Sequence, residues 1–155
     1  MVDFKKSFSA GINSAKAAEA NRADIQSVFD EVNKQLEEVT EGTIFIERRE
    51  YYVNNTIQDL AAIANLKPRE VYHAVVALNP KVPKSSEKEL ANWKMSKDGY
   101  PCRIYIGNNQ IVCEDKEALE GAMKELLSDT AVGEKLYQLM NLKIPKEESE
   151  DDVDA

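Results

Sequence analysis

The sequence predicts a mixed α+β fold, with helices at both ends of the chain and strands in the middle. Apolar residues recur every three or four positions from Asn13 to about Thr40, which is typical of one long amphipathic helix. Apolar and polar residues alternate on both sides of residues 107–109, which indicates a β-hairpin. Apolar stripes at helical spacing return after Asp115. The predicted order is α, β, α-α, β-hairpin, α-α, within a single domain of residues 1–146.

Composition and charge exclude several classes of protein. Hydrophobic residues make up 43% and charged residues 31% of the 155 positions, which excludes a wholly disordered chain, a collagen-like fibre and a coiled-coil rod. The formal net charge is −8, but residues 147–155 carry six acidic residues and no basic one. Residues 1–146 therefore sum to only −2, and we expect 147–155 to be a disordered acidic tail.

The lack of a recognisable targeting signal, together with the cysteine usage, favours a cytoplasmic protein. No segment approaches the roughly 20 apolar residues that a membrane span requires, and no apolar region follows the first lysines as in a secretory signal. Cys102 and Cys113 are the only cysteines. We expect both thiols to be reduced, with a single disulfide as the alternative.

The predicted N-terminal helix has an uneven apolar face. Its first turns, SAKAAEANRA, are rich in alanine and short of large apolar residues, so they either fray or pack only against a partner. The sequence leaves open whether residues 1–12 are ordered, and Gly42 is the expected stop signal. The helical stripe consists of Ile25, Val28, Phe29, Val32, Leu36 and Val39.

The middle of the chain mixes strand and helix signals. Residues 43–53 are β-branched and aromatic and predict a strand, whose charged middle argues against a doubly buried position. Two short helices are predicted at 56–65 and 68–78. Residues 81–89 then read as an exposed linker, and 90–96 as a further strand.

The hairpin and the C-terminal helices follow. A two-residue turn at Asn108 and Asn109 is expected to join the two strands. Its register pairs Ile106 with Ile111 and Ile104 with Cys113, and places Cys102, Ile104, Ile106, Ile111 and Cys113 on one apolar face. Asp115 is expected to cap the next helix, another helix restarts at residues 128–130, and Pro145 ends the folded part.

Residues 56–76, TIQDLAAIANLKPREVYHAVV, resemble the helix-turn-helix of the lac-repressor family, whose usual pattern is close to T-x-x-D-V-A-x-x-A-G-V-S-P-x-T-V-S. Thr56 and Asp59 match the start of the first helix and make sense as a capping pair. Asn65 stands where the family has a turn glycine, and asparagine tolerates the left-handed conformation. Lys67 replaces the serine cap of the second helix.

The resemblance implies a reading helix in the DNA major groove. Arg69 would then pair with guanine O6 and N7. Residues 67–103 carry a net charge of +4, which favours phosphate binding, although Glu70 opposes it. The predicted DNA-binding residues are Lys67, Arg69, Tyr72 and His73 on the reading helix, and Lys81 and Lys84 near the backbone.

Packing offers alternatives to DNA binding for the same segment. Residues 56–78 could form an αα-hairpin that fills the core. The β-branched content of VYHAVVAL, residues 71–78, also permits a buried strand.

Catalytic and metal-binding patterns are not found in the sequence. His73 is the only histidine, and no nucleophile-elbow motif accompanies it. Cys102 and Cys113 do not have zinc-ligand spacing. We therefore expect no enzyme activity, no metal and no small-molecule cofactor.

Two functional hypotheses follow from the sequence. The first is a non-enzymatic, regulatory protein that binds double-stranded DNA through residues 56–78, as a homodimer joined by the N-terminal helix. The second is an acidic protein–protein interaction module, such as an adaptor, accessory or inhibitory partner. Its recognition surface would use aromatic residues that could equally fill the core, namely Tyr51, Tyr52, Trp93, Tyr100 and Tyr105.

Overall fold

The computed structural model describes residues 1–53, 56–65, 68–83 and 86–142, and it confirms the α+β class. A five-stranded antiparallel sheet has the strand order β1-β2-β3-β4-β5. Pro145 and the tail 147–155 lie outside the described residues. The helices are α1 (Phe4–Thr40), α2 (Thr56–Ile63), α3 (Lys116–Ser128) and α4 (Thr130–Met140), and the strands are β1 (Phe45–Tyr52), β2 (Val71–Leu78), β3 (Lys88–Ser96), β4 (Gly99–Ile106) and β5 (Asn109–Cys113).

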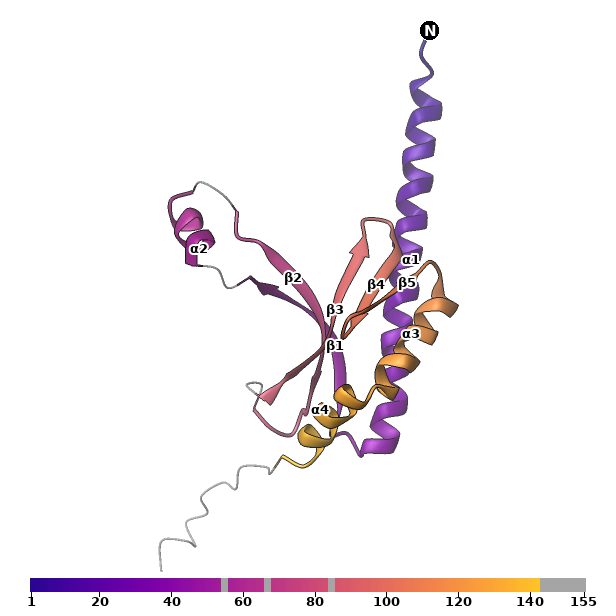
Figure 1. Ribbon diagram of the computed structural model, residues 1–155. Helices are drawn as coiled ribbons and strands as arrows, with labels where there is room; N and C mark the ends of the chain where they lie inside the picture. The colour runs from indigo at the N-terminus through magenta and orange to yellow at the C-terminus, as the bar shows by residue number, and fades with distance from the viewer. Residues whose placement is uncertain (54–55, 66–67, 84–85, 143–155) are drawn as a thin grey trace, which may run out of the picture.

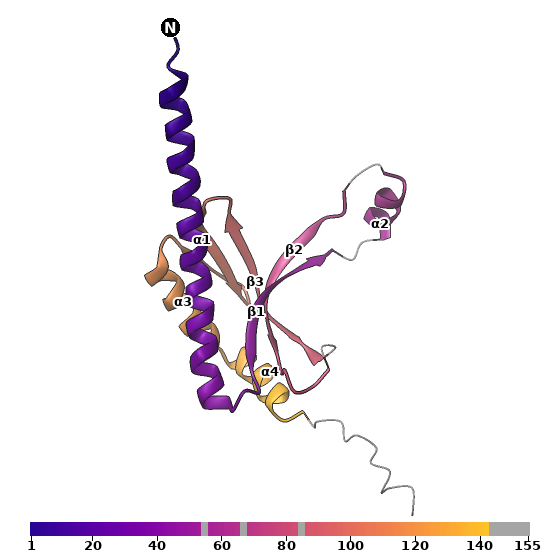
Figure 2. The same cartoon turned by 180° about the vertical axis from the view of Figure 1, so that it is seen from behind.

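The elements form two layers and two projections (Figures 1 and 2). Helices α1, α3 and α4 lie against one face of the sheet, and a single hydrophobic core fills the space between them. The β1–β2 hairpin extends away from this body and carries α2 at its tip. The N-terminal end of α1 projects past the β3–β4 turn.

Helix α1 begins nine residues before the predicted start at Asn13. The Asp3 carboxylate accepts a hydrogen bond from the Lys6 backbone N–H at 3.1 Å, which caps the first turn, and the following alanine-rich sequence favours a helix. The helix ends where Glu41 adopts a left-handed conformation and Gly42 has a φ of 76°. The predicted stop at Gly42 is therefore confirmed.

The second predicted helix, residues 68–78, is wrong in most of its length, because residues 71–78 form strand β2. The strand lies between β1 and β3, and its central residues, 74–77, are fully buried on both faces. Pairing with two neighbouring strands outweighs the weak helical spacing in this β-branched segment. The helix-turn-helix and the αα-hairpin are thus both replaced by the strand alternative, although Asn65 has the predicted left-handed φ, at 56°.

The β4–β5 hairpin keeps its predicted apolar face but has a different register. Its pairs are Ile106 with Asn109, Ile104 with Ile111, and Cys102 with Cys113. The turn is shifted because Gly107, with a φ of 58°, takes its first central position. A shift of two residues preserves which side chains point inward. Both cysteines are buried, directly opposite each other, and free.

The remaining predicted elements are confirmed with small changes. Strand β1 is an edge strand, as its charged middle indicated. Strand β3 begins at Lys88, so the predicted linker 81–89 ends two residues earlier, at residue 87. The carboxylates of Asp115 and Asp129 cap α3 and α4 by accepting from backbone N–H groups at 2.8 and 3.1 Å.

Replacing Phe29 by alanine should destabilise the fold strongly. Phe29 is 2% exposed and packs edge-on against Trp93 with ring centroids 5.6 Å apart. We expect Phe29→Ala to lower the free energy of unfolding by about 3–5 kcal/mol in urea titrations. Phe8→Ala is the matched control on the same helix, because Phe8 is 70% exposed. In dilute protein Phe8→Ala should change the free energy of unfolding by less than about 0.5 kcal/mol. An equal loss of stability in the two variants would contradict this packing of Phe29.

Candidate functional site

The predicted DNA-binding residues do not form one surface in the structure. Arg69, Tyr72 and His73 lie near the start of β2, on the projecting hairpin. Lys81 lies beyond the other end of β2, where its ammonium donates to the backbone carbonyl of Glu41 at 3.0 Å. Lys67 and Lys84 lie outside the described residues.

Acidic groups accompany the predicted reading residues. The Arg69 guanidinium lies 2.9 Å from the Asp59 carboxylate and 4.3 Å from the centre of the Tyr52 ring. The His73 ring nitrogen Nε2 is 3.6 Å from the carboxylate of Glu50. These contacts fix Arg69 between α2 and the hairpin and reduce the positive charge that phosphate would need.

A cluster of polar side chains covers the outer face of the sheet. We call it the sheet-face cluster. The Arg49 guanidinium contacts the carboxylates of both Glu47 and Glu87, and the Tyr51 hydroxyl donates to Glu87 at 2.9 Å. The Tyr51 and Tyr72 rings stack with centroids 5.5 Å apart. The members are Glu47, Arg49, Tyr51, Tyr72, Glu87 and Glu89, the last of which accepts from the Tyr72 hydroxyl at 2.8 Å.

Electrostatics and burial give this cluster a structural role. Partial burial opposes the charge of Arg49, but the carboxylates of Glu47 and Glu87 together raise its pKa. Burial, with the hydrogen bond to Glu87, raises the pKa of Tyr51 to about 12. Ala74 and Val76 point toward this face by strand alternation and are nevertheless fully buried. The cluster therefore shields the outer side of β2, with an excess of negative charge.

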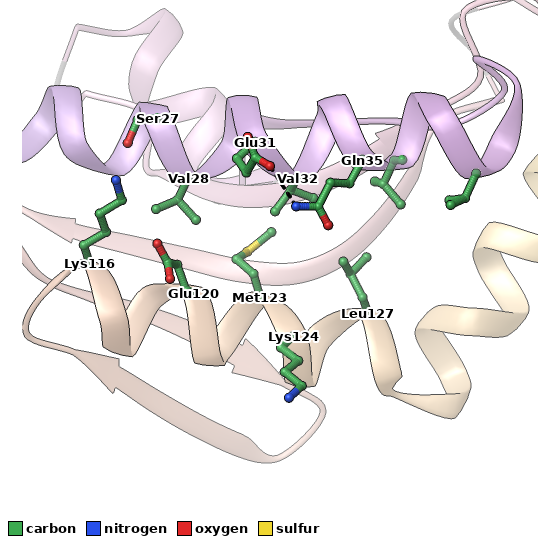
Figure 3. A pocket seen from close by; sticks show the side chains of 12 residues that line it. Ser27, Val28, Glu31, Val32, Gln35, Lys116, Glu120, Met123, Lys124 and Leu127 are labelled. Atoms are coloured by element: carbon green, nitrogen blue, oxygen red, sulfur yellow. Dashed lines mark hydrogen bonds between the residues drawn. The ribbon is translucent and has the colours of Figure 1, made fainter.

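A groove of about 690 Å³ runs between α1 and α3 (Figure 3). Its floor is apolar, with Val28 and Val32 of α1 facing Met123 and Leu127 of α3. The α1 residues that line it extend from Ser27 to Val39, a length of about 18 Å at 1.5 Å per residue. Its rim carries Glu31 and Gln35 on α1, joined by a 2.8 Å hydrogen bond, and Lys116, Glu120 and Lys124 on α3.

The projecting half of α1 presents large apolar side chains to solvent. Phe4, Phe8 and Ile12 are 76%, 70% and 41% exposed, and their spacing of four places them in one row along the helix. We call them the N-terminal apolar row. Every side chain from residue 4 to residue 17 is exposed, and Ala18, at 7%, is the first that packs against the body. The projection is thus about 20 Å long.

The N-terminal apolar row was missed in the sequence because small residues interrupt its pattern. Counting back from Phe29 in alternating steps of four and three passes Ile25, the charged Arg22, Ala18, Ala15 and Gly11 before it reaches Phe8 and Phe4. Such alternation is the heptad spacing of helices that pack against other helices. The signal was present, but Gly11 and Ala15 carry little hydrophobicity.

Three further features of the described residues concern membrane insertion, metal binding and thiol reactivity. No helix there has the length and apolarity needed to cross a membrane. No three histidine, cysteine or acidic side chains gather there in a way that could hold a metal. The hydrogen bond between the two thiols, with burial, raises the pKa of Cys102, so this thiol is held in its unreactive protonated form.

Glu87→Gln should lower the pKa of Tyr51, because it removes the negative charge that favours the neutral phenol. In the native protein the pKa is about 12, against about 10 for an unfolded tyrosine. This raised pKa stabilises the fold below pH 10, and the contribution is lost as the pH rises through 12. In an ultraviolet titration of tyrosinate, the pKa of one late-titrating tyrosine should move toward 10 in Glu87→Gln. It should not move in the control Glu19→Gln, whose substituted residue is exposed. An unchanged titration would contradict the proposed hydrogen bond.

Comparisons with known proteins leave the function to be argued from these surfaces. No protein-family model matches the chain, and neither the curated proteins nor the solved structures searched show a significant match. The exposed row on α1 and the apolar groove between α1 and α3 are two features that the packing of the chain itself does not account for, and Leu60 and Ile63 of α2 are likewise exposed.

Proposed function

We propose that this chain is a protein–protein interaction module whose binding element is the projecting half of α1. The observation that carries the proposal is the N-terminal apolar row, Phe4, Phe8 and Ile12, exposed on a helix that extends beyond the body. Helix-in-groove recognition uses apolar anchors at this spacing. The proposal follows the second hypothesis from the sequence, but it places the binding surface on α1 instead of on acidic residues.

The energetics favour binding over a purely structural role for this segment. An isolated helix of about 14 residues is marginal in water, since its formation depends on a costly nucleus. Here the nucleus is supplied by the packed half of the same helix, which contains Ile25 and Phe29. Burial of a Phe or Ile side chain by a partner stabilises the complex by about 1.5–3 kcal/mol per residue. Burial of the three side chains of this row by a partner would therefore contribute enough free energy to stabilise a specific complex.

The charge distribution also suits a contact with an acidic partner. Residues 1–22 hold four basic and two acidic residues, a net charge of +2 in a chain whose total is −8. The basic residues are Lys5, Lys6, Lys16 and Arg22. The binding element thus has the opposite sign to the rest of the chain, which favours encounter with acidic surfaces.

DNA recognition by a reading helix is not part of this proposal, because β2 occupies the position of that helix. Nucleic-acid binding by another surface stays a prediction. It separates from protein binding through its steep loss between 50 and 200 mM salt.

Phe8→Glu should abolish partner binding without unfolding the protein. A charge at the centre of the row opposes its burial, whereas Ala10→Glu places the same charge on the opposite side of the projection. Tagged wild-type chain and Ala10→Glu should retain the same defined protein in near-stoichiometric amount from an extract of the source cells. Phe8→Glu should retain at least about tenfold less. Equal retention by all three chains would overturn the proposal.

A further inference from the structure

The α1–α3 groove is long enough to hold the N-terminal apolar row. The groove is about 18 Å long on its α1 side, and the row spans about 12 Å along the helix from Phe4 to Ile12. The groove floor, which includes Val32, Leu36 and Leu127, offers an apolar lining. The row offers two phenylalanines and an isoleucine at the spacing that a groove accepts from a bound helix.

The helix segments that flank the groove and the projecting half of α1 carry opposite net charges. The two helix segments that flank the groove, residues 27–39 and 116–127, carry seven acidic and three basic residues, a net charge of −4. The projection, residues 4–17, carries three lysines and no acidic residue, a net charge of +3. The acidic residues of these two segments are Asp30, Glu31, Glu37, Glu38, Glu117, Glu120 and Glu125, and the basic ones are Lys34, Lys116 and Lys124. Of these, Glu31, Glu120, Lys116 and Lys124 line the groove itself. A helix that enters the groove with Lys5 and Lys16 beside its row would meet the carboxylates of Glu31 and Glu120 at a rim that also carries Lys116 and Lys124.

We infer that the α1–α3 groove of one copy binds the N-terminal apolar row of a second copy, so that the chain assembles head to tail. The inference rests on the proposed function, since it names the partner of the projecting helix. A chain cannot fill its own groove, because the row and the groove belong to one continuous helix.

Helix geometry makes this contact heterologous. At 3.6 residues per turn, Phe8 lies about 160°, 120° and 80° around α1 from the groove residues Val28, Val32 and Leu36, so the row and the groove occupy different sides of the helix. Two straight helices related by a two-fold axis face each other with one side only, so they cannot exchange row and groove reciprocally. Contacts between unlike surfaces instead propagate into a ring or an open chain of copies.

Complementing variants test this inference directly. Phe8→Glu disables the row and leaves the groove intact. The double variant Val39→Lys, Glu120→Lys disables the groove and leaves the row intact, and it changes only exposed side chains. Ala10→Glu is the control for Phe8→Glu, and circular dichroism verifies that each variant is folded.

Sedimentation velocity on the full chain gives the readout. We expect wild type and Ala10→Glu to form species larger than dimers as concentration rises, and each disabled variant to associate at least about tenfold more weakly. An equimolar mixture of the two disabled variants should stop at a dimer, because it retains one intact row and one intact groove.

Other outcomes would overturn the inference in recognisable ways. If the double variant Val39→Lys, Glu120→Lys formed dimers by itself, the N-terminal apolar rows of two copies would be binding each other and not the groove. A mixture that stays monomeric, or a monomeric wild type at every concentration, would exclude a second copy as the occupant of the groove. In that last case the proposed function would still stand if wild type and Ala10→Glu retained a different protein that Phe8→Glu lost.

Discussion

The packing of α1 on the sheet is the interaction on which the rest of the structure depends. Phe29 meets the Trp93 ring edge-on, and the Arg48 guanidinium lies 4.8 Å from the centre of the Phe29 ring. Burial lowers the pKa of Arg48, but the aromatic faces compensate its charge. The Asn33 amide also pairs with both the N–H and the carbonyl of Ile46 at 2.8 Å, which satisfies the backbone of this residue on the free edge of β1. These contacts fix the helix to the edge strand and to the centre of the sheet.

One helix consequently has two environments. The β3–β4 turn is docked on α1 through Asn21 and Arg22, whose side chains donate to the carbonyls of Asp98 and Lys97 at 3.0 Å. Gly99 permits this approach, since a Cβ there would lie 2.8 Å from that of Asn21. Toward the N-terminus the sheet no longer covers the helix, which continues with its apolar row exposed. The anchored half thereby holds the projecting half in a helical form ready to bind, which reduces the ordering entropy of binding.

The sequence predicted an element correctly where its local signal agreed with the tertiary packing. Asp115 and Gly42 mark helix ends by capping chemistry, and alternation identified the inward face of β4 and β5. The hairpin register was missed because Asn108 and Asn109 competed with Gly107 as turn residues. Residues 71–78 were assigned to a helix because their burial between two strands depends on partners far away in the sequence. The candidate site was missed because Phe4 and Phe8 precede the alanine-rich turns, and the groove exists only once α3 lies beside α1.

Hydrogen exchange measured along α1 at two protein concentrations tests most directly whether its projecting half is a binding element for another copy. Residues 25–36 should exchange slowly at both concentrations, because they belong to the core. In dilute protein residues 4–17 should exchange faster than residues 25–36, because their helical hydrogen bonds are exposed to solvent. They should become more protected in concentrated protein, and Phe8→Glu should remove that gain. Protection of residues 4–17 that is the same at both concentrations would contradict the account.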